Sequence, residues 1–345
     1  MKQTDSNEIL RAHIHYGRAS NTDIDLQDFE RLRTGRFRNI CKLGISYVLK
    51  WYFYVRFQII PRQRARKKAK YPLNLMVEPT NRCDLDCVFC PRQIMTRKQG
   101  DMKPSMFKSL IDDLRERKCL PFQIHMHFYG EPLLNSDLPK MIRMAKDAGV
   151  PIVRCNTNGT YLNSEKKCRE LLDSGVDILT VVVEPNENIQ AKTRINSDLE
   201  KVEQNMLRLK SLRKKRKPPL YGETLALKGI TYYTDLETGF ERWKRIFDLY
   251  DVIPASTVGG QVADYDLRPQ PKEYCSAIWT DSVILWNGDV TTCWTDPDGK
   301  FVMGNVEEES LADIWNCKKY ESMRDIHRRK EYSRIPLCNQ CMQAR

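Results

Sequence analysis

Strands and helices alternate along most of this 345-residue chain, and that alternation limits the folds open to it. Residues 73–78 and 122–128 each read as a strand with one apolar face. Between them, residues 107–114 carry an apolar stripe at helical spacing. Strands separated by helices favour parallel pairing with right-handed crossovers. About six strands are predicted between residues 73 and 258, which indicates an α/β fold with a parallel, barrel-like sheet.

Three cysteines, Cys83, Cys87 and Cys90, stand in the loop that leaves the first predicted strand. Structural zinc and ferredoxin-type sites use four protein ligands, which close every coordination position of the metal. Three cysteines leave one position open for chemistry. The loop follows the carboxyl end of a strand, where parallel barrels keep their active sites. A zinc site that borrows a fourth ligand from elsewhere in the chain is the alternative interpretation.

The C-x3-C-x2-C spacing of these cysteines resembles the motif of the radical S-adenosylmethionine (SAM) superfamily. The resemblance implies a partial (β/α)6 barrel in which the three thiolates bind three irons of a 4Fe-4S cluster and SAM chelates the fourth. It also implies reductive cleavage of SAM to a 5′-deoxyadenosyl radical, which abstracts a hydrogen atom from the substrate.

Other segments resemble the SAM-binding elements of that superfamily. The run 129–132, Tyr-Gly-Glu-Pro, resembles its Gly-Gly-Glu-Pro motif, which holds the SAM ammonium group. Tyr129 replaces the first glycine, so we expect a narrower pocket. Core aromatics, turn residues and a surface arginine would look the same in the sequence, and those interpretations stay open. The resemblance implies a cofactor-binding set of Phe89, Gly130, Glu131, Pro132, Asn156, Asn158 and Arg194.

The group that would take a proton from the substrate cannot be identified from spacing. Arg154 and Glu184 are the candidates, and Tyr129 and His127 are also conceivable. Glu184 lies where the superfamily usually shows the aspartate of a Ser-x-Asp-Gly pattern. His125 and His127 share one face of a predicted strand, and we expect them to be satisfied histidines of the barrel interior rather than metal ligands.

The C-terminal part predicts a second cysteine site. Two extended runs flank Asn287-Gly288, a strong hairpin signal, and a helix capped by Ser310 follows. This part resembles a SPASM domain, and its short C-terminus resembles the twitch variant, which implies one auxiliary 4Fe-4S cluster. A closed zinc site is the alternative. The predicted ligands are Cys275, Cys293, Cys338 and Cys341.

Positive charge is concentrated near the N-terminus. Residues 31–70 carry thirteen Lys or Arg and no Asp or Glu, while the whole chain has a net charge of +12. Lys50 and Arg56 interrupt the aromatic run 45–60, which argues against a membrane-spanning helix. Residues 37–70 could anchor to an anionic membrane surface, or form a helix packed on the barrel with a solvated basic tail. Nucleic-acid binding is less favoured because no recognition module accompanies the patch.

We therefore expect three parts: a basic, aromatic, helical extension (1–70), a radical SAM partial barrel (71–262), and a small domain of β-hairpin plus helix (263–345). Radical oxidation of a sugar, cyclitol or glycoconjugate alcohol, with the auxiliary cluster as electron acceptor, is the favoured function. Peptide maturation is the alternative, although residues 1–70 lack the strand-rich pattern of a leader-binding module. We expect a low-potential electron donor such as flavodoxin or ferredoxin. The polar first residues favour a cytoplasmic protein, at most peripheral on the inner membrane face.

Overall fold

The computed structural model describes residues 70–213, 218–227, 230–255, 258, 261–262, 275, 277–339 and 341. The predicted N-terminal extension and membrane anchor lie outside these residues, except for Lys70. Residues 263–274, next to the predicted domain boundary, also lie outside them. Within the described part, no helix is long and apolar enough to cross a membrane.

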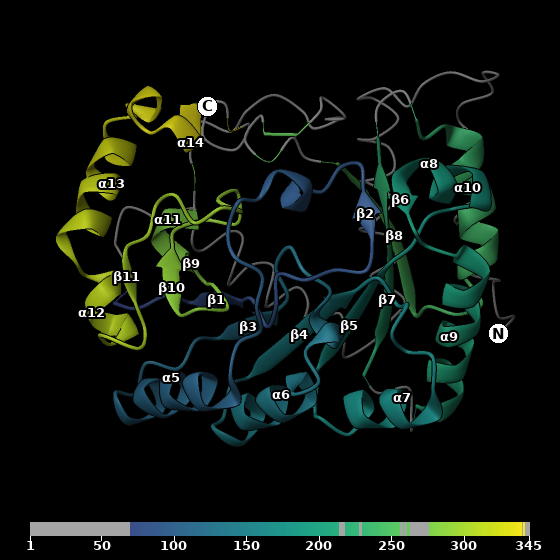
Figure 1. Ribbon diagram of the computed structural model, residues 1–345, viewed down its shortest axis with the longest axis horizontal. Coiled ribbons are helices and arrows are strands. Elements are labelled where there is room, and N and C mark those ends of the chain that lie inside the picture. Colours follow the sequence, from purple (N-terminus) through teal and green to yellow (C-terminus); the bar gives the residue numbers. More distant parts are fainter. Residues whose placement is uncertain are drawn as a thin grey trace, which may run out of the picture.

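A nine-stranded sheet forms the centre of the molecule (Figure 1). Six of its strands pair in parallel, each with the next along the chain. This arrangement confirms the predicted α/β fold with a partial barrel. The six strands are β1 (Asn74–Val77), β3 (Gln123–Met126), β4 (Ile152–Thr157), β5 (Ile178–Val182), β7 (Leu220–Ala226) and β8 (Leu249–Pro254).

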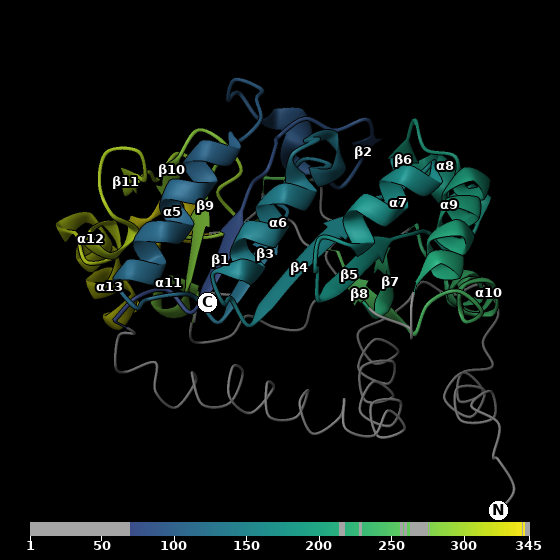
Figure 2. The same cartoon turned by 90° about the horizontal axis from the view of Figure 1, so that it is seen from below.

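Helices cover the outer, convex face of this curved sheet (Figure 2). The apolar stripe predicted in residues 107–114 is the buried face of α5. Ser164 and Asp198 cap the helices that follow them by accepting a hydrogen bond from a backbone N–H of the first turn. The covering helices are α5 (Pro104–Glu116), α6 (Leu138–Asp147), α7 (Glu165–Leu172), α8 (Glu187–Thr193), α9 (Leu199–Leu212) and α10 (Tyr233–Trp243).

Strands β3 and β4 carry polar side chains on the inner face of the sheet. In β3, Ile124 and Met126 are buried against the helices, whereas Gln123 and His125 lie half-buried on the other face. In β4, the same alternation puts Arg154 and Asn156 on the inner face. Closed barrels fill their interior with branched apolar side chains. This barrel instead presents hydrogen-bonding groups to its interior, as a binding site for a polar molecule requires.

The predicted C-terminal hairpin joins the same sheet. Strand β9 (Asp281–Ile284) pairs in parallel with β1, and β10 (Asp289–Thr291) returns antiparallel to β9. The turn is longer than a two-residue Asn-Gly turn, because the Leu285 N–H donates to Asp289 O and the Gly288 N–H to Leu285 O. Gly288 has φ +88°, the left-handed conformation that ends a three-residue hairpin loop. The short strand β11 (Gly304–Asn305) completes this edge.

Short helices pack the C-terminal part against β9 and β10. Arg324 on α13 is fully buried between the rings of Trp315 and Tyr320, 4.2 and 4.5 Å from their centroids. It donates to Ile278 O (3.2 Å) and Trp315 O (2.8 Å), which joins α13 to its neighbours. The predicted Ser310 cap is present on α12. The helices are α11 (Ala277–Thr280), α12 (Leu311–Trp315), α13 (Lys318–Arg328) and α14 (Pro336–Asn339).

Candidate active site

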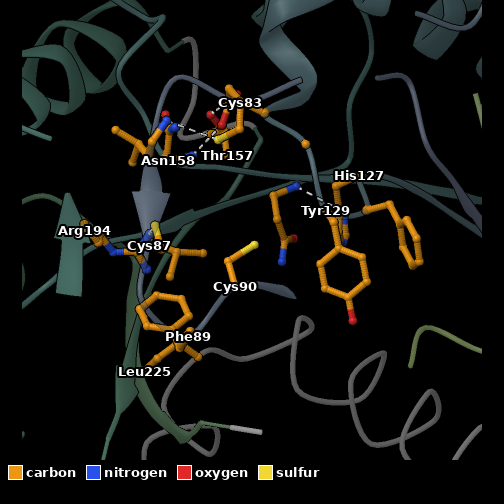
Figure 3. A pocket seen from close by; sticks show the side chains of 16 residues that line it. Cys83, Cys87, Phe89, Cys90, His127, Tyr129, Thr157, Asn158, Arg194 and Leu225 are labelled. Carbon is orange, nitrogen blue, oxygen red and sulfur yellow. Dashed lines mark hydrogen bonds between the residues drawn. The ribbon is translucent and has the colours of Figure 1, made fainter. Parts of the chain in front are cut away.

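A cavity of about 200 Å³ lies at the carboxyl ends of the parallel strands (Figure 3). All three cysteines of the first motif line it, as does every predicted SAM-binding residue except Pro132. Pro132 is buried beside the cavity, in the first position of the short helix η3 (Pro132–Leu134). The cavity lining thus brings together residues from six separate segments of the chain.

The cysteine loop is held by pairing outside the main sheet. Strand β2 (Asp86–Cys87) pairs antiparallel with β6 (Arg194–Ile195), so that Cys87 lies opposite Arg194. Burial raises the pKa of Cys83 to about 12 and that of Cys90 to about 11. Without a cation these thiols stay protonated, because the pocket destabilises thiolates. The iron ions of a cluster supply the positive charge that thiolate ligands need, so the donor set suits a metal centre.

Asp84 fastens the cysteine loop to the end of β4. Its carboxylate accepts hydrogen bonds from Asn158 Nδ2 (2.8 Å) and Thr160 Oγ1 (2.6 Å). The sequence analysis did not identify Asp84 or Thr160, because a polar residue beside a cysteine gives no sign of a partner far along the chain. Asn158 therefore has a bond to the loop in addition to its predicted place in the cavity lining.

Glu131 is a buried acid tied to the same strand end. Its carboxylate accepts from Thr157 Oγ1 (2.7 Å), the Asn158 N–H (2.8 Å) and the Leu133 N–H (3.1 Å). Burial raises its pKa to about 7 despite these bonds. Gly130 is required beside it, since a Cβ there would lie 2.1 Å from Thr80 O. Glu131 lines the cavity as expected, and its role toward the SAM ammonium stays a prediction.

Arg194 offers an unused donor to the cavity. Its Nε donates to Glu184 Oε1 (2.7 Å), its Nη1 lies 3.7 Å from Cys87 Sγ, and its guanidinium lies over the Phe89 ring at 5.1 Å. Among the described residues, Arg194 Nη2 is buried without a hydrogen-bond partner. Asn156, which lines the same cavity, has its Oδ1 buried without a partner as well. Buried groups of this kind are costly unless a ligand satisfies them. One donor and one acceptor fit the carboxylate and hydroxyl or amino groups of SAM.

The two candidate proton acceptors lie in different places. Glu184 is fully buried behind Arg194 and is absent from the described lining of this cavity. Arg154 lines a second cavity of about 280 Å³, together with His125, Asp281 and Cys293. The structure therefore gives Arg154, but not Glu184, direct access to space for a ligand. Because a guanidinium stays protonated, Arg154 can orient a hydroxyl there but cannot take its proton.

His125 in β3 and His127 just after it are each bonded within the protein. His127 Nδ1 accepts from the Asn156 N–H (3.2 Å), so the neutral ring carries its proton on Nε2. Burial, followed by the charge of Arg154, lowers the pKa of His127 to about 3. His127 is therefore a hydrogen-bond donor in the first cavity rather than a base. His125 Nε2 pairs with Gln123 Nε2 (2.7 Å), which agrees with the expectation of satisfied interior histidines.

The four C-terminal cysteines gather from three segments of the chain. Burial raises the pKa of Cys275, Cys293 and Cys338 to about 12, and the neighbouring thiols, including Cys341, add to this shift. His327 Nε2 lies 3.5 Å from Cys338 Sγ, a contact that the sequence analysis missed. Among the described residues, no three His, Cys, Asp or Glu side chains form a site for a single metal ion. Ligands of a 4Fe-4S cluster each bind a different iron, which is a different geometric requirement.

Comparisons with known proteins agree with this arrangement. Residues 77–236 match the family model of the radical SAM superfamily, and residues 275–342 match that of SPASM, an iron-sulfur cluster-binding domain. The chain belongs to the radical SAM superfamily and carries a C-terminal domain of the SPASM type. It is a radical SAM enzyme, and its cofactors are SAM, the SAM-bound 4Fe-4S cluster and an auxiliary 4Fe-4S cluster.

Individual relatives include both small-molecule and peptide enzymes. The chain is 26% identical over 270 residues to the S-adenosyl-L-methionine-dependent 2-deoxy-scyllo-inosamine dehydrogenase of Niallia circulans, covering 77% of this chain and 90% of the relative. Its fold resembles that of BtrN in complex with AdoMet and 2-DOIA (TM-score 0.56, 22% identity, 78% and 92% covered). It also resembles Streptococcus suis SuiB bound to the precursor peptide SuiA (TM-score 0.63, 14% identity, 97% and 81% covered).

Proposed function

We propose that this protein oxidises a secondary alcohol of a sugar, cyclitol or glycoconjugate. The observation that carries the proposal is the row of polar side chains on the inner side of β3 and β4, where Asn156 lines the SAM cavity and Arg154 and His125 line a second cavity beside Cys293. Likeness to a cyclitol dehydrogenase over nearly the whole length of that relative supports it. When bound, the cofactors supply a hydrogen-abstracting radical and an acceptor for the second electron.

We assign the ligands of each cofactor from the two groups of cysteines. Cys83, Cys87 and Cys90 hold the catalytic cluster, since they line the cavity that contains the SAM-binding residues. Arg194 Nη2 and Asn156 Oδ1 bind polar groups of SAM, because each is buried without a partner among the described residues. The auxiliary cluster is held by Cys275, Cys293, Cys338 and Cys341.

The second cavity suits a ring-sized, hydroxylated substrate. Its volume of about 280 Å³ is near the lower end for ligand pockets. Arg154 and His125 contribute hydrogen-bonding groups from β4 and β3, and Asp281 contributes a carboxyl from β9. In the first cavity, His127 Nδ1 already accepts a hydrogen bond from the Asn156 N–H. The ring therefore has its Nε2–H left to donate to an oxygen of a bound molecule. Arg154 remains the candidate group for orienting the reacting hydroxyl.

Peptide modification is the second candidate. The fold likeness to SuiB extends over 97% of this chain, more than the 78% covered by BtrN. A peptide substrate would have to thread along the same polar inner face, whose two cavities are small. This alternative predicts that a precursor peptide, and no cyclic polyol, is the source of the hydrogen atom recovered in 5′-deoxyadenosine.

The deciding experiment follows a hydrogen atom. Reconstituted protein is incubated anaerobically with SAM, a flavodoxin or ferredoxin reducing system, and 2-deoxy-scyllo-inosamine or related cyclitols and sugars deuterated at carbon. Deuterium in 5′-deoxyadenosine, together with a ketone product, is the expected result. Release of 5′-deoxyadenosine without deuterium from any polyol, alongside transfer from a peptide, would replace the alcohol with the peptide class.

We also propose that residues 37–70 attach the enzyme to anionic membrane surfaces. The proposal is supported by their basic and aromatic composition. Full-length protein should float with vesicles containing phosphatidylglycerol and stay unbound with phosphatidylcholine alone, and added salt should release it. Equal recovery with both vesicle types would contradict an electrostatic anchor.

A further inference from the structure

Tyr129 stands where the superfamily motif has its first glycine, and it joins the two halves of the enzyme. Its hydroxyl donates a hydrogen bond of 2.6 Å to Trp294 O, across 165 positions of sequence. Trp294 directly follows Cys293, one of the assigned auxiliary-cluster ligands. A glycine could not make this bond, since it has no side chain.

The Tyr129 ring lies between the two cofactor sites. It lines the SAM cavity (Figure 3), while Trp294 and Cys293 line the second cavity. Cys90 lines the same cavity as Tyr129, and Cys293 directly precedes the residue to which the Tyr129 hydroxyl donates. One ring is therefore close to a ligand of each assigned cluster. The ring also packs against Phe128, with centroids 4.4 Å apart, which restricts its position.

We propose that Tyr129 is a positioning residue that separates and fixes the two cofactor sites. Its ring closes the SAM cavity on the side of the auxiliary site. Its hydroxyl fixes the segment Cys293–Trp294, and with it one ligand of the auxiliary cluster. The inference rests on the proposed cysteine ligand sets but not on the identity of the substrate.

Two substitutions separate these roles. Tyr129→Phe removes the hydroxyl bond to Trp294 O and keeps the ring. Tyr129→Gly, which restores the residue of the superfamily motif, removes both. Tyr250→Phe is the matched control: it also removes a tyrosine hydroxyl bond, to Thr224 Oγ1 (2.6 Å), and it lines neither cavity among the described residues.

The hydroxyl is tested by the reduction potential of the auxiliary cluster. A variant with Cys83, Cys87 and Cys90 all changed to Ala isolates that cluster for a redox titration followed by electron paramagnetic resonance. Tyr129→Phe should shift the midpoint, because the bond that fixes the Cys293–Trp294 segment is lost, while Tyr250→Phe leaves it unchanged. An unchanged midpoint in Tyr129→Phe would contradict the proposal that the hydroxyl bond positions a ligand of the auxiliary cluster.

The ring is tested by access of a chelator to the clusters of the otherwise wild-type protein. Loss of visible absorbance in EDTA should be several-fold faster for Tyr129→Gly than for wild type, and unchanged for Tyr129→Phe. Equal rates of absorbance loss for Tyr129→Gly and wild type would contradict the proposal that the ring closes the SAM cavity. If Tyr129→Gly does not fold, the Tyr129→Phe titration still decides the positioning role. Neither measurement uses a substrate, so failure of the proposed alcohol oxidation leaves both results interpretable.

Discussion

The first cysteine site draws its three thiols from a single loop, whereas the C-terminal site gathers four cysteines from three separate segments. Three contacts hold the loop of the first site to the barrel: the hydrogen bonds of Asp84, the contact of Arg194 with Cys87, and the pairing of β2 with β6. The second site depends on a hairpin and on helices packed around Arg324. A site carried by one loop tolerates changes elsewhere, while a site assembled from distant segments depends on the packing between them.

Removal of thiols from one site should leave the other intact. Cys83→Ala with Cys87→Ala and Cys90→Ala should lower the iron content from about eight to about four per chain. It should also abolish 5′-deoxyadenosine formation. Cys338→Ala with Cys341→Ala should lower the iron by a similar amount while SAM binding survives. Loss of all iron in either variant would show that the two sites fold together rather than separately.

Disturbing the packing should damage only the C-terminal site. Arg324→Met leaves Ile278 O and Trp315 O without their donor, and unsatisfied buried acceptors together with lost ring contacts cost about 4 kcal/mol. We expect loss of the auxiliary iron with retention of the catalytic cluster, measured by iron content and by thermal unfolding. Lys319→Met, at an exposed position on the same helix, should change neither.

The sequence predicted the parts of the fold that depend on local pattern. Periodicity found the six parallel strands and the stripe of α5. Cysteine spacing predicted the two cysteine sites, and their ligand sets stay a prediction. The sequence could not predict that β9 pairs with β1, because alternation identifies a hairpin but not the sheet edge that it joins. Asp84 and His327 were missed for the same reason, since their roles depend on partners distant in sequence.

Glu131 in the barrel site should make part of the protein's stability depend on pH. Glu131 has a folded-state pKa of about 7, above its usual value of 4.5, because of burial. Between these pH values the folded protein holds a proton that the unfolded chain releases, so this group reduces stability as the pH rises. The total is on the order of 3 kcal/mol above pH 7. Below pH 4.5 both states are protonated and the effect vanishes.

Glu131→Gln tests this, because glutamine cannot ionise. Its melting temperature relative to wild type should rise between pH 4.5 and 7 and level off above pH 7. Glu308→Gln, at an exposed position, should follow wild type at every pH. A constant difference between Glu131→Gln and wild type would mean that the acid is ionised in the folded protein throughout this range.

The smallest effect we expect comes from the anchor of the cysteine loop. Asp84→Ala removes the acceptor of Asn158 Nδ2 and Thr160 Oγ1 while leaving all cluster thiols in place. The loss of about 1.5 kcal/mol should weaken SAM binding roughly tenfold, measured by equilibrium dialysis on reconstituted protein. Asp86→Ala is the matched control in the same loop, since its half-exposed carboxylate bonds only Arg92 and Asn196 among the described residues, in solvent-exposed contacts that are worth little. Equal SAM affinity of the two variants would indicate that the β2–β6 pairing alone holds the loop, and the first site would then depend on fewer contacts than its bonding suggests.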